Sequence, residues 1–284
     1  VLDITREEVR EYIFSTISAL ILESNYEPGA YVDSTSVVGK RLLPETEGME
    51  HQPDGQLPRG ITYIKWDMNR HLTDVYSAAP SATPETQQTI FFRFVLGSYW
   101  LFSRFTKAFP DILFESCSGG GGRFDPGMLY YTPQIWCSDN TDAFKRMKIQ
   151  YGTSLVYPPF TMGAHYSVVP NHITHNLIRS RTRALCAMAG SYGYELDLSP
   201  SKDPEDNGRP MALAPGELEQ IQQYTTFFKQ VALILRQSDF YRLLSPYEVQ
   251  YAAWMFVTQD KSRGFVFAFN RNSQVSRLVP RLKL

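Results

Sequence analysis

The sequence predicts an α/β fold: a (β/α)8 barrel of the TIM type that lacks its first strands, followed by the beginning of an antiparallel β domain. Three observations favour this fold. Short apolar segments alternate with helical segments, about six times in all, which is typical of a parallel sheet with helices outside it. A pattern of two strands joined by a polar turn starts after about residue 247. Polar side chains stand at nearly every predicted strand end, where a barrel has its active site: Asp3, Asp67, Cys117, Asp139, His165 and Asp197. An open doubly wound sheet is the alternative.

The first elements are a strand end at residues 1–3 and a helix over residues 4–23. Thr5 is predicted to cap this helix, with Glu8 as its capping-box partner. Residues 24–59 are polar, contain glycine and proline, and have no clear periodicity, so we interpret them as an insertion in the barrel.

The strand and helix pattern then repeats up to residue 246, which gives a partial catalytic barrel over residues 1–246 and the start of a β-sandwich over residues 247–284. The predicted strands are 61–67, 111–117, 133–139, 161–167 and 193–199, and the predicted helices are 86–109, 141–152, 175–190 and 215–235. Two final strands are predicted within residues 251–271.

Composition excludes several classes of protein. The net charge of −1 gives no reason to expect nucleic acid or an anionic membrane as a partner. No apolar segment reaches the length of about 20 residues that a membrane helix needs. Three cysteines do not suggest a disulfide framework. No signal peptide is visible, which favours the cytoplasm over secretion. Because the chain starts at Val1, we also expect it to be a fragment whose own N-terminus is missing.

The segment ITYIKWDMNR, residues 61–70, ends a strand in several polar groups. Side chains alternate between the two faces of a strand, so Lys65, Asp67 and Asn69 share one face and Trp66 and Met68 share the other. An ammonium group beside a carboxylate favours the ionised carboxylate. This pattern indicates a site, because a strand that only fills a core needs none of these groups.

The segment CSGGGGRFD, residues 117–125, follows the next predicted strand. Its glycines allow backbone conformations closed to other residues and close approach of a ligand to the amides. It does not match the phosphate-binding motifs of nucleotide-binding proteins. A flexible loop is the alternative to a binding loop.

A second strand-end carboxylate, Asp139, lies in WCSDNTDAFKR, residues 136–146. Asn140 or Thr141 is predicted to cap the following helix, with Asp142 in its first turn. A role as a helix cap is the alternative for Asp139 taken alone. Two carboxylates at one barrel mouth suggest glycoside hydrolysis, which uses one to attack the sugar and one to protonate the leaving oxygen. Weaker candidates are Glu115, Glu195 and Asp197, and the histidines His165, His172 and His175 form no recognised metal motif.

Taken in order, KWDMNR, ESCSGGGGRFD, W-x-SDNTDA and IQYGTSLVYP resemble glycoside hydrolase family 36, the α-galactosidases. The likeness includes MGAHYSVVPNH and AMAGSYGYELDL, and it covers nearly everything except residues 24–59. It implies a retaining mechanism on terminal α-linked galactose, with Asp67 as nucleophile and Asp139 as acid and base. It places Lys65, Trp66, Asn69, Cys117 and Gly120 in the substrate-binding set and implies no metal or organic cofactor.

The resemblance also implies a small α-galactoside oligosaccharide as partner and leaves a homo-oligomeric full-length form open. Family members carry sugar-binding groups ahead of the segment that corresponds to Val1, so we expect this chain alone to be poorly stable and weakly active or inactive. A raffinose-synthase-type galactosyl transferase or an α-N-acetylgalactosaminidase would use the same two aspartates. A noncatalytic sugar-binding remnant is the alternative of another class, and a phosphate-binding protein that uses the glycine loop is a more distant one.

Overall fold

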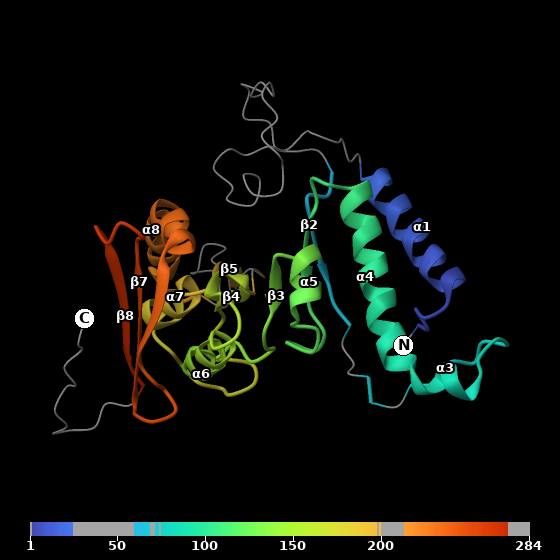
Figure 1. The fold of residues 1–284 in the computed structure, drawn as a ribbon. Coiled ribbons are helices and arrows are strands. Elements are labelled where there is room, and N and C mark those ends of the chain that lie inside the picture. The colour runs from blue at the N-terminus through green and yellow to red at the C-terminus, as the bar shows by residue number, and fades with distance from the viewer. Residues whose placement is uncertain are drawn as a thin grey trace. The chain divides into compact units, whose positions relative to one another are not determined.

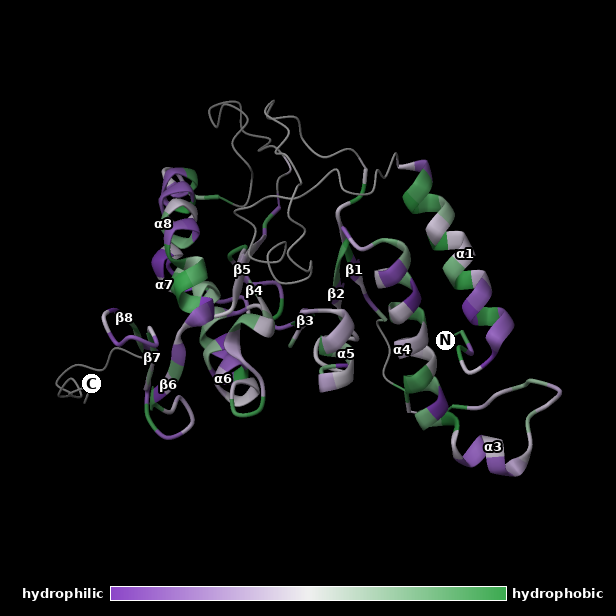
Figure 2. Ribbon diagram, turned by 45° about the horizontal axis from the view of Figure 1, so that its top comes forward, coloured by the Kyte–Doolittle hydropathy of each residue, from purple (hydrophilic) through white to green (hydrophobic). Residues whose placement is uncertain are grey.

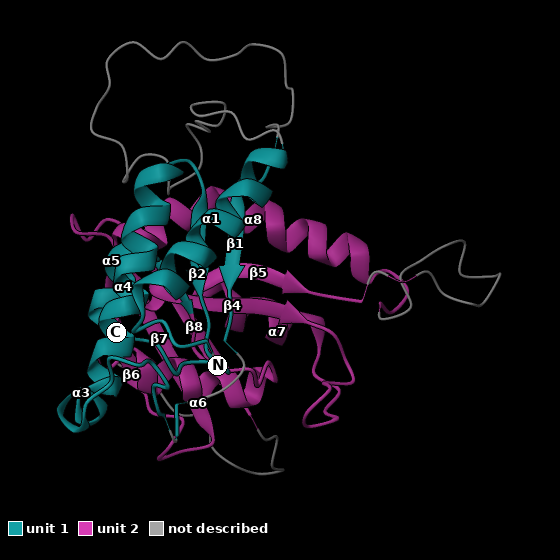
Figure 3. Ribbon diagram, turned by 90° about the vertical axis from the view of Figure 1, so that its right-hand side faces the viewer, with its two compact units in different colours: residues 1–135 teal, residues 136–284 magenta. Residues whose placement is uncertain are grey.

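The structure is a computed structural model that describes residues 2–24, 60–68, 72–73, 75–197, 199 and 213–271. The predicted insertion, from residue 25 onward, lies outside the described residues. The chain consists of two compact units, residues 1–135 and 136–284, which are coloured separately in Figure 3. Each unit is described by itself.

Unit 1 consists of short parallel strands and longer helices (Figure 1). Its elements are α1 (Glu7–Glu23), β1 (Tyr63–Trp66), α3 (Pro84–Gln88), α4 (Ile90–Ala108), β2 (Leu113–Ser116), α5 (Pro126–Tyr131) and the first two residues of β3 (Gln134–Trp136). Strand β1 pairs in parallel with β2, with Lys65 opposite Glu115, and β2 pairs in parallel with β3. This is the parallel arrangement that the strand and helix alternation predicts.

Helix α4 contributes Phe94, Leu101, Phe102 and Phe105 to the core of unit 1. Its buried positions recur at intervals of three and four residues, as expected for one face of a helix: Phe94, Gly97, Ser98, Leu101, Phe102 and Phe105. Phe105 also packs against Phe14 of α1, with ring centroids 5.0 Å apart. The short α3, with the sequence PETQQ, is hydrophilic and has no buried residue (Figure 2).

The predicted start of the chain is wrong in two details. Residues 2–3 form no strand, and the first helix begins at Glu7 with Arg6 as its N-cap and no side-chain cap. Thr5 is not the cap: it lies one residue before the N-cap, and both its hydroxyl and its amide donate to Asp3 Oδ1, at 2.5 Å and 3.2 Å. Asp3 therefore closes a local turn ahead of the helix.

Unit 2 combines two parallel strands, three long helices and an antiparallel sheet. Its elements are α6 (Ala143–Thr153), the 3₁₀ turn η1 (Pro159–Thr161), β4 (Met162–Ser167), α7 (Ser180–Met188), β5 (Ser191–Glu195), α8 (Glu217–Gln237), β6 (Asp239–Leu244), β7 (Tyr251–Val257) and β8 (Gly264–Asn270). Strands β4 and β5 are parallel, and β6, β7 and β8 form an antiparallel sheet in that order. The predicted class, α/β with an antiparallel sheet after it, is confirmed.

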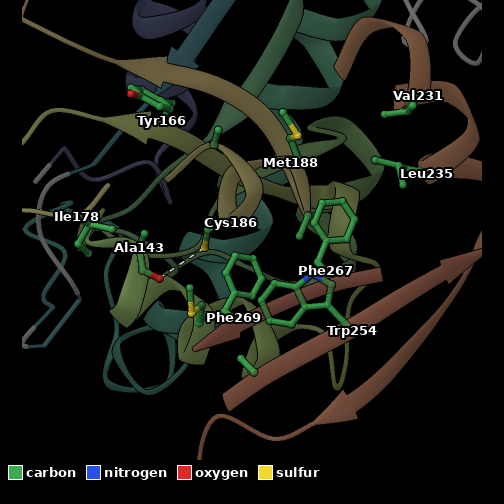
Figure 4. Close-up of a cluster of buried hydrophobic side chains, with 14 of the residues drawn as sticks. Ala143, Tyr166, Ile178, Cys186, Met188, Val231, Leu235, Trp254, Phe267 and Phe269 are labelled. Atoms are coloured by element: carbon green, nitrogen blue, oxygen red, sulfur yellow. Dashed lines mark hydrogen bonds between the residues drawn. The ribbon is translucent and has the colours of Figure 1, made fainter. Parts of the chain in front are cut away.

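The antiparallel sheet begins earlier than the sequence predicts, because β6 starts at Asp239, ahead of residue 247. Its neighbour β7 places Trp254 in one hydrophobic cluster with residues of α7 and α8, such as Met188 and Leu235. Figure 4 shows Trp254 close to Phe267 and Phe269 of β8. The sheet therefore shares its core with the helices of unit 2, and whether residues 247–284 begin a separate domain stays a prediction.

Within the described residues, no helix combines the length and the apolar character that crossing a membrane requires.

Candidate active site

Asp67 directly follows the carboxyl end of β1. The backbone hydrogen bonds between β1 and β2 continue past this residue. The amide of Cys117 donates to the carbonyl oxygen of Trp66 at 2.9 Å, and the amide of Met68 donates to the carbonyl oxygen of Cys117 at 3.2 Å. The residues on both sides of Asp67 are thus bonded to one residue of the neighbouring segment. This pairing fixes the backbone of Asp67 and leaves its side chain exposed.

The glycine loop begins at Cys117 and turns sharply. Gly119 and Gly120 have φ angles of 51° and 87°, in the left-handed region that glycine adopts without steric cost. The Ser118 amide donates to the Gly120 carbonyl oxygen at 3.1 Å, which closes the turn. Glycine is therefore required here by backbone geometry, and the turn brings the amide of Gly120 back to Cys117.

The thiol of Cys117 interacts with three other predicted site residues, Lys65, Asp67 and Gly120. Its pKa is raised to about 11, first by burial and then by the hydrogen bond to Asp67 and the negative charge of that carboxylate, while the Gly120 amide and Lys65 oppose the shift. A thiol with this pKa is neutral near pH 7 and can donate a hydrogen bond. Lys65, Asp67, Cys117 and the Gly120 amide therefore lie together at the carboxyl ends of β1 and β2.

Sequence reasoning missed Arg123, which lies in the same place. Its guanidinium donates from Nη2 to the carbonyl oxygen of Trp66 at 3.1 Å and to that of Cys117. Burial lowers the pKa of Arg123, and the charge of Asp67 is the first of the effects that oppose this shift. A signal was present, because an arginine directly after four glycines is the one cation in that loop.

Two members of the predicted substrate-binding set are placed differently. The ring of Trp66 packs in the core of unit 1, with centroids 5.4 Å from Phe102 and 5.3 Å from Phe105. It lies on the opposite face of β1 from Lys65, as the alternation of strand side chains predicts. A sugar-binding role for Trp66 stays a prediction and forms no part of the function proposed below. Asn69 lies outside the described residues.

Glu115 is buried inside unit 1 and not in the loop. The hydroxyl of Tyr63 and the amide Nε2 of Gln134 both donate to its Oε2, the latter at 2.8 Å. These bonds connect three neighbouring strands through one carboxylate. The contacts give Glu115 a structural role that accounts for its burial.

Asp139 follows β3 in unit 2, and its side chain is exposed. The indole Nε1 of Trp136 donates to its Oδ1 at 3.1 Å. The next turn is capped by Asp142, whose Oδ1 accepts from the amide of Lys145 at 3.1 Å. The predicted caps were therefore wrong: Asp142 itself is the N-cap of α6, and Asn140 accepts from the Asp142 amide at 3.1 Å.

Trp136 is only 3% exposed and lies against two charged or titratable side chains. Its ring centroid is 4.4 Å from that of His165 of β4 and 4.8 Å from the guanidinium carbon of Arg146 of α6. His165 Nδ1 in turn lies 3.8 Å from Glu195 Oε2 at the end of β5. His165 and Glu195 thus belong to the surroundings of Trp136.

The remaining candidates are Asp197, His172 and His175. Asp197 is exposed, and hydrogen bonds from the side chain and the amide of Ser199, the latter at 2.9 Å, lower its pKa. His172 and His175 lie in the segment after β4, where His175 has a φ of 57°. Among the described residues, no group of three or more histidine, cysteine, aspartate or glutamate side chains is arranged to hold a metal ion.

Comparison with known proteins adds the family. The family model described as Melibiase matches residues 56–230, a span that contains both strand-end aspartates. This chain belongs to the Melibiase family, the α-galactosidases of glycoside hydrolase family 36. The resemblance stated from the sequence motifs is thereby confirmed.

Relatives of this Melibiase chain are α-galactosidases by name. AgaA of Geobacillus stearothermophilus is 42% identical over 284 residues, which are 100% of this chain and 32% of that protein. α-Galactosidase 1 of Pediococcus pentosaceus is 46% identical over 224 residues, 79% of this chain and 29% of that protein. The chain spans about a third of the length of these relatives.

Solved structures of the family match along the whole chain. The crystal structure of AgaA from Geobacillus stearothermophilus matches with a TM-score of 0.78 at 42% identity, over 100% of this chain and 33% of that one. The galactosidase domain of the α-galactosidase–sucrose kinase AgaSK matches with a TM-score of 0.76 at 35% identity, over 100% of this chain and 31% of that domain. Variants of AgaA have been crystallised in complex with raffinose and with stachyose. The match identifies the parallel strands of this Melibiase chain as part of a TIM barrel, as predicted.

Proposed function

We propose that this chain carries catalytic residues of a retaining α-galactosidase that releases terminal non-reducing α-D-galactose from oligosaccharides such as raffinose and melibiose. The observation that carries the proposal is the grouping of Lys65, Asp67, Cys117 and the Gly120 amide at the carboxyl ends of β1 and β2, in a chain of this family. The carboxyl ends of the strands are where barrel enzymes carry their chemistry.

In the proposed reaction, Asp67 attacks the anomeric carbon and Asp139 gives its proton to the glycosidic oxygen as the bond to the leaving sugar breaks. A covalent galactosyl ester on Asp67 results. Asp139, now ionised, takes a proton from water, and the water oxygen attacks the anomeric carbon and releases Asp67. Two displacements retain the α configuration.

The polar groups around Asp67 suit a sugar ligand. The Lys65 ammonium, the neutral Cys117 thiol and the Gly120 amide are hydrogen-bond donors, and galactose presents hydroxyl oxygens that accept them. Asn69, which the family resemblance includes in the substrate-binding set, completes this proposed set.

Single substitutions test the two catalytic roles. We expect Asp67→Ala and Asp139→Asn, in the protein expressed from its complete gene, each to lower the hydrolysis of raffinose by at least about 100-fold, the usual contribution of a general acid or more. Asp197→Ala is the matched control, since Asp197 is also an aspartate after a strand, and it should keep most of the activity. Retention of activity by Asp67→Ala would refute the proposal.

The covalent step has its own test. A 2-deoxy-2-fluoro-α-galactosyl fluoride should label the protein once, and peptide mass analysis should find the sugar on Asp67. In proton spectra of the first product, α-galactose should precede the β anomer. A β-first product would exclude the retaining mechanism, and a galactosylated acceptor without free galactose would favour a transferase.

A further inference from the structure

We propose that Trp136 is the positioning residue of the acid/base Asp139, and that its indole N–H determines which carboxylate oxygen carries the transferred proton. The inference rests on the proposed function, in which Asp139 is the acid and base. Its basis is the hydrogen bond of 3.1 Å from Trp136 Nε1 to Asp139 Oδ1. Asp139 is exposed, so without such a bond its carboxyl would rotate freely between orientations.

The donor itself is held rigidly. Trp136 is 3% exposed, and its ring contacts the imidazole of His165 and the guanidinium of Arg146. Arg146 is buried as well, and its Nη1 donates to the carbonyl oxygen of Ser138 at 3.1 Å. The residue before Asp139 and the indole that bonds its side chain therefore both depend on one arginine. A catalytic group needs this kind of support, because small displacements cost much rate.

The direction of the bond assigns the proton. An indole nitrogen has one hydrogen and no acceptor site, so it can only donate. Oδ1 must therefore act as an acceptor while it is bonded to Trp136, and the proton of the acid form lies on Oδ2. Oδ2 then delivers the proton to the glycosidic oxygen and later takes one from water. The same indole bond is present in both steps, so no rearrangement is needed between them.

Trp136→Phe removes the N–H and keeps most of the ring. We expect kcat/KM for raffinose to fall about 10-fold or more, since a hydrogen bond to a charged group and part of general acid catalysis are lost. For 4-nitrophenyl α-galactoside, whose leaving group departs without protonation, we expect a fall of less than about 3-fold. The ratio of the two values does not depend on the folded fraction of the sample, so a loss of folded protein cannot imitate the effect.

Trp254→Phe is the matched control. Trp254 belongs to β7 of the same unit, is 1% exposed, and its Nε1 has no hydrogen-bond partner among the described residues. Trp254→Phe removes the same atoms from a buried ring as Trp136→Phe does, but it breaks no hydrogen bond to a carboxylate. We expect it to lower the stability and to leave the ratio between the two substrates unchanged.

The outcomes separate the inference from the function on which it rests. Equal losses on both substrates, or a ratio equal to that of Trp254→Phe, would overturn the role of Trp136 while Asp139→Asn still impairs hydrolysis. If Asp139→Asn retains full raffinose hydrolysis, the proposed function fails first. Azide, which replaces a missing base in the second displacement, should restore turnover of the nitrophenyl substrate in Asp139→Ala and give little change in Trp136→Phe.

Discussion

The Nη1 atom of Arg146 donates a hydrogen bond of 3.1 Å to the carbonyl oxygen of Ser138, the residue directly before Asp139. The same guanidinium donates to the carbonyl oxygen of Gly163 in β4. A buried cation thus connects the backbone beside one candidate catalytic aspartate to another segment of its unit. Arginine suits this role because its planar group presents several donors in fixed directions.

Arg123 makes the corresponding contacts in unit 1, with the carbonyl oxygens of Trp66 and Cys117 beside Asp67. We expect Arg123→Met to lower the free energy of unfolding by about 2–4 kcal/mol, because two bonds from a charged donor are lost. Loss of support for Asp67, the proposed nucleophile, should lower kcat by about 10-fold to 100-fold and change KM less. Kinetics and urea unfolding of the protein from its complete gene measure both.

Arg93→Met is the control for this change, since Arg93 is an exposed arginine of α4 in the same unit. Arg93→Met should change neither the free energy of unfolding nor kcat strongly. Arg123→Lys keeps the charge but not the planar fork, and it should recover part of the stability. An Arg123→Met protein with unchanged kcat would show that the two carbonyl contacts do not position Asp67.

Cys117 gives a prediction at alkaline pH. Its pKa is raised from 9.0 to about 11, first by burial, so the folded state favours the protonated thiol. The unfolded chain loses this proton from about pH 9, and the folded state only near pH 11. The stabilising contribution is therefore complete below pH 9 and is lost as the pH rises toward 11. Urea unfolding at pH 8 and pH 10.5 should show the fall, and Cys117→Ala should reduce it. An equal fall of the free energy of unfolding between pH 8 and pH 10.5 in Cys117→Ala and in the unchanged protein would contradict the prediction.

Glu217 gives the opposite dependence in unit 2. Burial raises its pKa, but hydrogen bonds from Tyr166, the Ala214 amide and Arg183 outweigh burial and lower the pKa below 4.5. The unfolded state therefore takes up a proton at a higher pH than the folded state, and stability is lost as the pH falls below about 4.5. Glu217→Gln should unfold more easily at pH 7 and lose less between pH 7 and pH 3. Glu219→Gln, two residues further along α8 and exposed, is the control.

Much of the fold could be predicted because the apolar and polar pattern is local. Helix α4 carries a buried stripe at intervals of three and four residues, and it lies within the predicted helix 86–109. Strand β4 likewise lies within the predicted strand 161–167. The strand alternation also placed Lys65 and Asp67 on one face, and the glycine loop was recognised from its composition. These signals depend on neighbours in sequence, which a single chain reveals.

What sequence reasoning missed depends on partners far away in the chain. Strand β6 lies between the predicted helix 215–235 and the predicted strands of 251–271, and it is defined by its pairing with β7, with Arg242 opposite Trp254. Thr5 is an exception, because its partner is local: its hydroxyl bonds to Asp3, two residues earlier, and the helix begins after Arg6. The role of Arg123 appears only when two strand ends lie side by side.

The support of Trp136 extends to β5 and yields a last prediction. Gly193 stands opposite His165 in the β4–β5 pairing, and a Cβ there would lie 2.8 Å from His165 Cδ2 and 3.1 Å from Nε2. Gly193→Ala must therefore displace the imidazole that packs against Trp136, at a cost of about 1–3 kcal/mol for overpacking. We expect a lower melting temperature and a selective loss on raffinose compared with 4-nitrophenyl α-galactoside.

Gly264→Ala is the matched strand glycine, because its Cβ would meet only ordinary contacts, at 3.7 Å from Phe256 O and 3.9 Å from Val257 Cγ2. Thermal unfolding and the two kcat/KM values for both variants decide the matter. If Gly193→Ala and Gly264→Ala have the same ratio of kcat/KM for raffinose to kcat/KM for 4-nitrophenyl α-galactoside, the imidazole of His165 has no part in holding the indole of Trp136. If Gly193→Ala lowers kcat/KM for raffinose relative to the nitrophenyl substrate, as Trp136→Phe does, the position of the Asp139 carboxyl depends on packing that begins two strands further along the chain, at a residue with no side chain of its own.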